Sequence, residues 1–135
     1  MIVDDVADEI VAQLDTIAGL RCYKGPPHSV TPPAAILPLP TTGEFDQTYG
    51  RGLDMLTFSL VVLVGKPDDR VIMKNMGQYL DGSGAASIKA VLQAGTYTTL
   101  HSLRVASWET DTVNWQGTEY AAAVFEIEVY GQGSA

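Results

Sequence analysis

The residues of this chain that could do chemistry are few and lie far apart in the sequence. The only two histidines are His28, in a proline-rich stretch, and His101, at the entry to a predicted strand. Nucleophilic catalysis requires a Ser or Cys within hydrogen-bond reach of such a base, and the sequence has neither a GxSxG motif nor a Cys-Gly-rich context. We therefore expect surface or capping roles for both histidines, and no enzymatic activity.

One short segment, Asp81-Gly82-Ser83-Gly84, has the composition of an anion-binding turn before a predicted helix. Exposed N–H groups at a helix start attract phosphate, but this segment has no Walker lysine and does not follow a strand. A cap by Ser83 on the following helix is the simpler interpretation. The sequence predicts no cofactor site.

Acidic residues occur in pairs that could hold a cation. Asp4-Asp5 and Asp68-Asp69 lie at predicted helix starts, where the helix dipole favours carboxylates, and neither pair has the ligand spacing of an EF-hand. Glu109 and Asp111 could bind a metal, although a solvated hairpin is the better interpretation. The lone Cys22 has no Cys or His at metal-ligand spacing and is expected to be a small buried hydrophobe. We predict no metal site.

Length and charge limit the possible classes of function. A chain of 135 residues can bury one continuous core, so we expect a single domain. Eight basic and sixteen acidic residues give a net charge of −8, and such a surface repels phosphate. The longest apolar runs are too short to span a bilayer, and the N-terminal residues do not resemble a signal peptide. Direct nucleic-acid binding and membrane association are not expected.

The hydrophobic pattern predicts an α+β fold. Helical spacing predicts a first helix at residues 3–17, which ends at Gly19. It also predicts a central pair of helices. The first of the pair begins at residues 66–69 and extends to residue 80, and the second covers residues 84–94. Strands are predicted at residues 20–24 and 34–37, on either side of the proline-rich loop 25–33, and at 102–109 and 118–130, joined around residues 114–117. A long projecting hairpin is predicted at residues 44–64, with its turn at residues 49–52.

These elements should form a mixed, mainly antiparallel sheet of about five strands. The N-terminal helix and the central helix pair should pack on it, in one domain of residues 1–130. Residues 131–135 have nothing to pack against, so we expect a flexible C-terminal tail.

Aromatic residues gather in the predicted connections. Phe45, Tyr49 and Arg51 belong to the long hairpin, and Trp108 and Trp115 flank the last turn. Tyr, Trp and Arg are enriched at interface hot spots, so these five residues are our candidates for subunit contacts. We predict that strand edges and the hairpin at residues 44–54 join neighbouring subunits, because closed symmetry removes exposed edges. For Trp108, a cap on the domain's own core is an equal alternative.

The order of elements resembles that of tail terminator proteins from long-tailed, siphovirus-type bacteriophages, especially those infecting actinobacteria. The similarity covers nearly the whole chain and is carried by Asp68-Asp69-Arg70, residues 78–92, Leu103-Arg104-Val105 and residues 123–130. It implies a homo-hexameric ring that caps the tail tube, ends its polymerisation and docks the head-tail connector or head-closure protein. It also implies assembly in the host cytoplasm, a place at the neck of the virion, and neither enzymatic activity nor a cofactor.

Six copies would carry a formal charge of −48, six times −8. An acidic lumen of that kind would let genomic DNA pass without specific binding. Two alternatives stay open: a sibling assembly role, as a head-closure or tube protein, and a monomeric ligand-binding or enzymatic domain with the loop at residues 25–33 beside a pocket.

Overall fold

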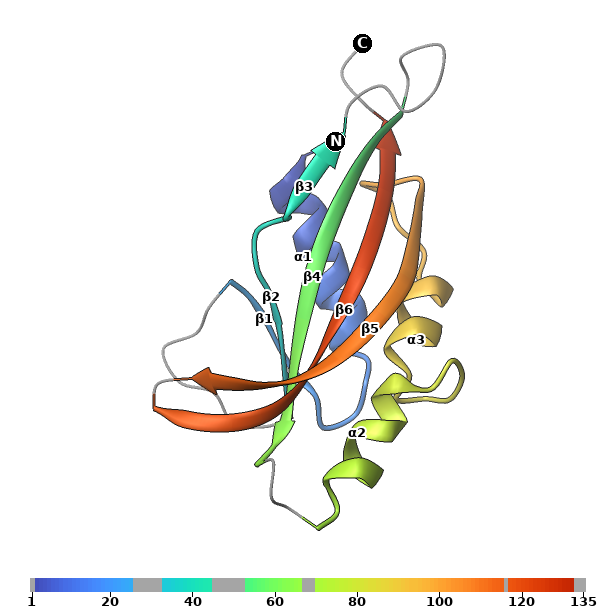
Figure 1. Ribbon diagram of the computed structural model, residues 1–135. Helices are drawn as coiled ribbons and strands as arrows, with labels where there is room; N and C mark the ends of the chain where they lie inside the picture. Colours follow the sequence, from blue (N-terminus) through green and yellow to red (C-terminus); the bar gives the residue numbers. More distant parts are fainter. Residues whose placement is uncertain (1, 26–32, 45–52, 67–69, 116, 133–135) are drawn as a thin grey trace.

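The computed structural model describes residues 2–25, 33–44, 53–66, 70–115 and 117–132. The described residues have the predicted α+β class, with three helices on one face of a strongly twisted sheet (Figure 1). The helices are α1 (Val3–Leu14), α2 (Ile72–Leu80) and α3 (Ile88–Ala94). The described strands number six, against about five expected: β1 (Arg21–Lys24), β2 (Ala34–Leu37), β3 (Thr42–Glu44), β4 (Leu53–Gly65), β5 (Ser102–Trp115) and β6 (Thr118–Gln132).

The sheet is mixed and mainly antiparallel, as predicted. Its strand order is β1-β2-β4-β6-β5, and β3 pairs separately with β4. Only β1 and β2 are parallel among the described strands, while the β2–β4, β3–β4, β4–β6 and β5–β6 pairs are antiparallel. β1 and β5 are therefore the two end strands of this path.

The central position of β4 follows from its sequence. Alternate residues Phe58, Leu60 and Val62 face the helices and are fully buried. On the other face Leu63 is also buried, as expected for a strand covered on both sides. Each such side chain contributes about 1.5–3 kcal/mol on burial, so β4 anchors the core.

The main core lies between the sheet and the three helices. β6 contributes Phe125, Ile127 and Val129, and α1 contributes Ile10 and Leu14, all with at most 1% of their surface exposed. A second, smaller cluster lies on the opposite face, where Ile36, Leu63 and Ala122 are buried. Five partly buried residues pack around it: Tyr23, Val61, Val113, Trp115 and Tyr120.

Several predicted helix boundaries need correction. α1 ends at Leu14, three residues before the predicted end, and a turn leads to Gly19, whose φ of 79° is the predicted left-handed conformation. α3 begins at Ile88 and not at residue 84, so Ser83 does not cap it. The cap is Ser87, whose side chain accepts from the Ala90 N–H at 3.1 Å and donates to the Asp81 carbonyl.

The hairpins also differ from prediction. β3 pairs with β4 over only three residues, Thr42–Glu44, and the expected turn at residues 49–52 lies outside the described residues. The long hairpin of the described chain is β5–β6, because β5 continues past Glu109 to Trp115. β6 extends through Gly131 and Gln132, which pair with β4, so two residues of the predicted tail belong to a strand. Residues 133–135 lie outside the described chain.

Candidate docking surface at the β5 edge

The outer half of β5 is the most exposed stretch of sheet in the described chain. Six consecutive residues, Ser107–Thr112, are exposed, although they pair with β6 along one side. In a strand, alternate side chains point to opposite faces, so consecutive exposure means that neither face is covered there. The outer edge of this segment therefore presents backbone groups and side chains together.

At both ends of this exposed segment, a side-chain oxygen accepts a hydrogen bond from an outward-pointing backbone N–H group. The Val105 N–H donates to Gln93 Oε1 of α3 at 3.2 Å, and the Thr112 N–H donates to Asp111 Oδ1 at 2.8 Å. Because alternate residues of an antiparallel edge strand direct their N–H groups outward, the Thr112 bond places the N–H groups of Trp108 and Thr110 on the same outer side. Between the two capped positions lies an edge of the kind that accepts another strand.

An apolar groove borders this edge on the helix side of the sheet. Its volume is about 620 Å³, and α2 contributes Ile72, Met73 and Met76 to it while β5 contributes Trp108 and Thr110. Met73 is 85% exposed and Trp108 is 48% exposed. Met side chains adapt to partners of different shape, and Trp is enriched at interface hot spots. The groove and the edge thus form one continuous surface, which we call the β5 surface.

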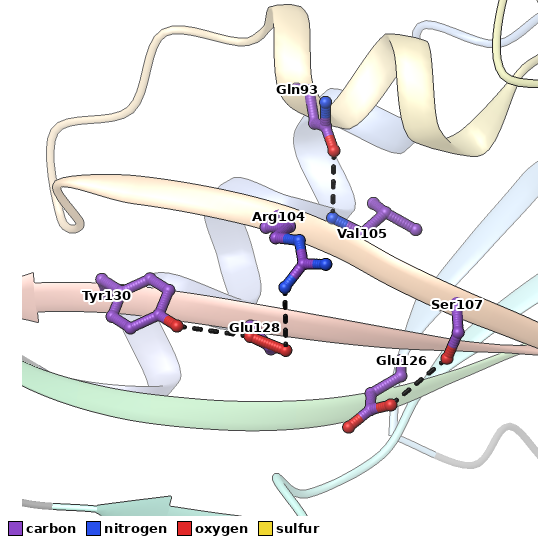
Figure 2. A network of polar contacts seen from close by, with 7 residues as sticks. All are labelled: Gln93, Arg104, Val105, Ser107, Glu126, Glu128 and Tyr130. Atoms are coloured by element: carbon purple, nitrogen blue, oxygen red, sulfur yellow. Dashed lines mark hydrogen bonds and ion pairs between the residues drawn. The ribbon is translucent and has the colours of Figure 1, made fainter.

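The opposite side of β5 is acidic. Figure 2 shows Glu126 accepting from the Ser107 hydroxyl at 3.2 Å and Glu128 lying 3.6 Å from Arg104. Glu128 also accepts from the Tyr130 hydroxyl at 3.3 Å. The pKa of Tyr130 is raised, mainly because the hydroxyl is partly removed from solvent and secondly because the negative charge of Glu128 lies close to it.

Exposed acidic residues give this side of the sheet its negative charge. Glu109, Asp111 and Glu126 are exposed, and within the described residues none has a cation at ion-pair distance. Glu109 and Asp111 lie on the same face of β5, two residues apart. The β5 surface is therefore apolar on the helix side and negative on the other.

The two predicted interface tryptophans occupy different environments. Trp108 is on the β5 surface and half exposed, which favours a contact residue over a simple core cap. Trp115 packs against the smaller cluster, and its buried Nε1 has no hydrogen-bond partner. The other three candidates, Phe45, Tyr49 and Arg51, lie outside the described residues.

A second apolar groove, of about 750 Å³, lies near the opposite end of the sheet. It runs between the start of α1 and the segment after β2, and Val3, Ala7, Leu37 and Phe58 line it. Leu39, at 83% exposure, also belongs to it. Lys24, at the end of β1, borders the groove. Such a surface is suited to an apolar side chain of a partner.

The two histidines and the acidic residues of α1 were also candidates from the sequence. His101 is exposed and lines neither groove, and His28 lies outside the described residues. Asp4, Asp5 and Asp8 come together on α1, but the Lys24 ammonium lies 2.6 Å from Asp4 and 2.8 Å from Asp8. That lysine already supplies the local positive charge.

Cys22 is half-buried against the core, close to the expected burial. Burial, reinforced by Asp15, raises the pKa of the Cys22 thiol to about 12. The thiol is therefore protonated near neutral pH and a poor nucleophile.

Sequence reasoning missed the groove beside α2 and the capping role of Gln93. The exposed methionine at position 73 gave a signal, because it extends the apolar stripe of α2 beyond what one sheet face can cover.

No protein-family model and no curated protein matches the chain. Within the described residues, every helix is too short or too polar to cross a membrane.

Proposed function

We propose that this protein is a non-enzymatic assembly subunit that forms a ring by docking copies of itself, in the role of a phage tail terminator. The observation that carries the proposal is the β5 surface, where an exposed strand edge, Trp108 and an apolar groove adjoin. A strand edge of this length invites pairing with another chain, and closed cyclic symmetry satisfies it without uncontrolled growth.

The terminator role itself comes from the resemblance in element order. In that role the ring, expected to be a hexamer, caps the tail tube, ends its polymerisation and docks the connector. The acidic side of the sheet is consistent with a lumen through which DNA passes without specific binding. Glu109, Asp111 and Glu126 are the candidates to line it.

Assembly is tested by native mass spectrometry and negative-stain electron microscopy over a wide range of protein concentration, with purified tail tubes added as a template. We expect closed rings, and we expect Trp108→Ala to weaken them while leaving the circular dichroism of the monomer unchanged. A matched control is Trp115→Phe, which keeps the aromatic packing of the smaller cluster. A chain that stays monomeric under all these conditions, tubes included, contradicts the proposal.

The specific role is tested by deleting the gene from the phage that carries it. Loss of a terminator should leave overlong tubes without heads, whereas loss of a tube protein should leave no tubes. A head-closure protein is separated by a third result, tails of normal length that fail to join heads. Turnover of a substrate by the isolated monomer would favour the ligand-binding or enzymatic alternative.

A further inference from the structure

The charge on the β5 surface restricts which strand can pair with it. Two β5 edges meeting in an isologous contact would bring Glu109 and Asp111 of one copy against the same residues of the other. Like charges directly opposite each other across a strand pair are destabilising. A dimer through two β5 edges is therefore disfavoured, and the edge requires a partner with positive charge on the corresponding face.

The other end strand of the same sheet meets this requirement. In β1 the N–H groups of Arg21 and Gly25 donate inward, to Pro33 at 3.2 Å and Leu37 at 2.8 Å. The intervening residues Cys22 and Lys24 therefore direct their backbone N–H groups outward. Like Trp108 and Thr110 on β5, they offer backbone N–H groups that have no strand partner among the described residues.

Side chains on the two edges are complementary on both faces of the sheet. Arg21 is exposed on the face that carries Glu109 and Asp111, and within the described residues it has no ion-pair partner. On the helix face, Lys24 borders the groove beside α1, and Trp108 is exposed at the β5 end. A continuous sheet through two copies aligns like faces, so the cation meets the acids and the tryptophan meets the apolar groove.

We infer that the β5 edge of one copy pairs with the β1 edge of the next, with Arg21 facing Glu109 and Asp111. This rests on the proposed function, and it adds which two surfaces meet. The contact is heterologous, so it repeats from copy to copy and does not stop at a pair, and it forms a ring when the rotation between neighbours closes. On the sheet face opposite the helices, it brings the exposed cation of the β1 end onto the exposed acids of the β5 end.

A charge exchange tests the pairing. Arg21→Glu alone, or Glu109→Arg with Asp111→Arg, should raise the concentration for half-assembly at least about tenfold, since like-charge juxtaposition at an interface costs several kcal/mol. Combining the three substitutions should restore assembly to near the wild-type concentration. Lys74→Glu on α2 is the matched control, because it makes the same change in net charge as Arg21→Glu away from both edges. Failure of the triple variant to recover any assembly overturns the inference.

Cross-linking provides a second readout that is independent of charge. In a Cys22→Ser background, Arg21→Cys with Asp111→Cys in one chain should give a ladder of oligomers with a short bis-maleimide. Each single-cysteine chain should give no ladder. Dimers from Asp111→Cys alone would indicate an isologous contact and overturn the inference.

The two proposals fail in distinguishable ways. Rings that persist without the expected cross-links overturn the β1–β5 pairing and leave the proposed function standing. A chain that stays monomeric, and gives no cross-links even with tubes present, contradicts both.

Discussion

Glu9 shows how one charged side chain joins two elements. It lies on α1 and accepts from the backbone N–H groups of Thr98 at 3.0 Å and Thr99 at 2.6 Å, and from the Thr99 hydroxyl. These bonds, the Thr99 hydroxyl first, lower the pKa of Glu9 below its ordinary value. The carboxylate thereby fixes the segment between α3 and β5 against the first helix.

The lowered pKa of Glu9 sets the sign of a pH effect. Because the pKa of Glu9 is lower in the folded state than in the unfolded state, its ionised carboxylate stabilises the fold at pH values above the unfolded-state pKa, near 4.5. This stabilisation is lost as the pH falls through the lower, folded-state pKa. We expect Glu9→Gln to reduce the free energy of unfolding by about 1 kcal/mol at pH 7, measured by urea titration. The difference from wild type should shrink below pH 4.5, with Glu119→Gln as the exposed control. A difference that stays constant from pH 7 to pH 3 contradicts this role.

Replacing glycine by alanine should have opposite effects on the free energy of unfolding at Gly95 and at Gly77. A Cβ at Gly95 would lie 2.8 Å from the Tyr97 ring and 2.9 Å from Gln13 Cδ. Neither side chain is free to move, because the Tyr97 hydroxyl donates to the Leu92 carbonyl at 2.5 Å and Gln13 Nε2 donates to the Val91 carbonyl at 2.9 Å. We expect Gly95→Ala to lower the free energy of unfolding by about 1–3 kcal/mol.

The matched glycine is Gly77, in α2, where a Cβ would meet no atom within 4 Å. Here alanine should raise the free energy of unfolding by about 0.5–1 kcal/mol, because alanine is the better helix former. Both variants are compared by thermal and urea unfolding. Equal effects at the two positions would show that the contacts around Gly95 are not rigid.

At the scale of elements, the strength of the local signal decided what could be predicted. Alternation of apolar residues placed β4 and β6. The start of α3 was misplaced because Ser83 and Ser87 are both acceptable N-caps, and the choice depends on the turn at Gly84, whose φ is 109°, and on a bond from Ser87 to Asp81. Such contacts form only in the folded chain.

The outer half of β5 was not predicted as strand for a different reason. Residues from Thr110 to Asn114 are mostly polar and show no apolar alternation, so only pairing with β6 makes them extended. The candidate site was therefore only partly predictable. Trp108 was named from its residue type, whereas the groove, the caps and the acidic side required the register of the sheet.

The edge of β5 gives a prediction that separates folding from assembly. The Thr110 N–H points outward, so proline at this position removes no bond to β6, and edges tolerate proline for this reason. We expect Thr110→Pro to change the free energy of unfolding by about 1 kcal/mol or less, yet to abolish rings in electron micrographs. Glu109→Pro, one residue away, removes an inward N–H and should cost about 2 kcal/mol more. Rings that form normally with Thr110→Pro would show that no strand adds at this edge.

For the whole molecule, net charge opposes the assembly that local charges favour. Each copy carries −8, and for neighbours about 35 Å apart in water the mutual repulsion is about 8 kcal/mol before screening. Salt reduces this to about 2 kcal/mol at 0.01 M and to about 0.1 kcal/mol at 0.15 M, because the Debye length falls from about 30 Å to about 8 Å. A close pair such as Arg21 with Glu109 is screened much less. We therefore expect ring formation, measured by sedimentation velocity, to strengthen as salt rises from 0.01 to 0.15 M. It should strengthen less for Asp5→Asn with Glu119→Gln, because these two exposed acids lie on neither β1 nor β5 and their replacement reduces the net negative charge. Weakening over the same range would mean that local ion pairs dominate the contact.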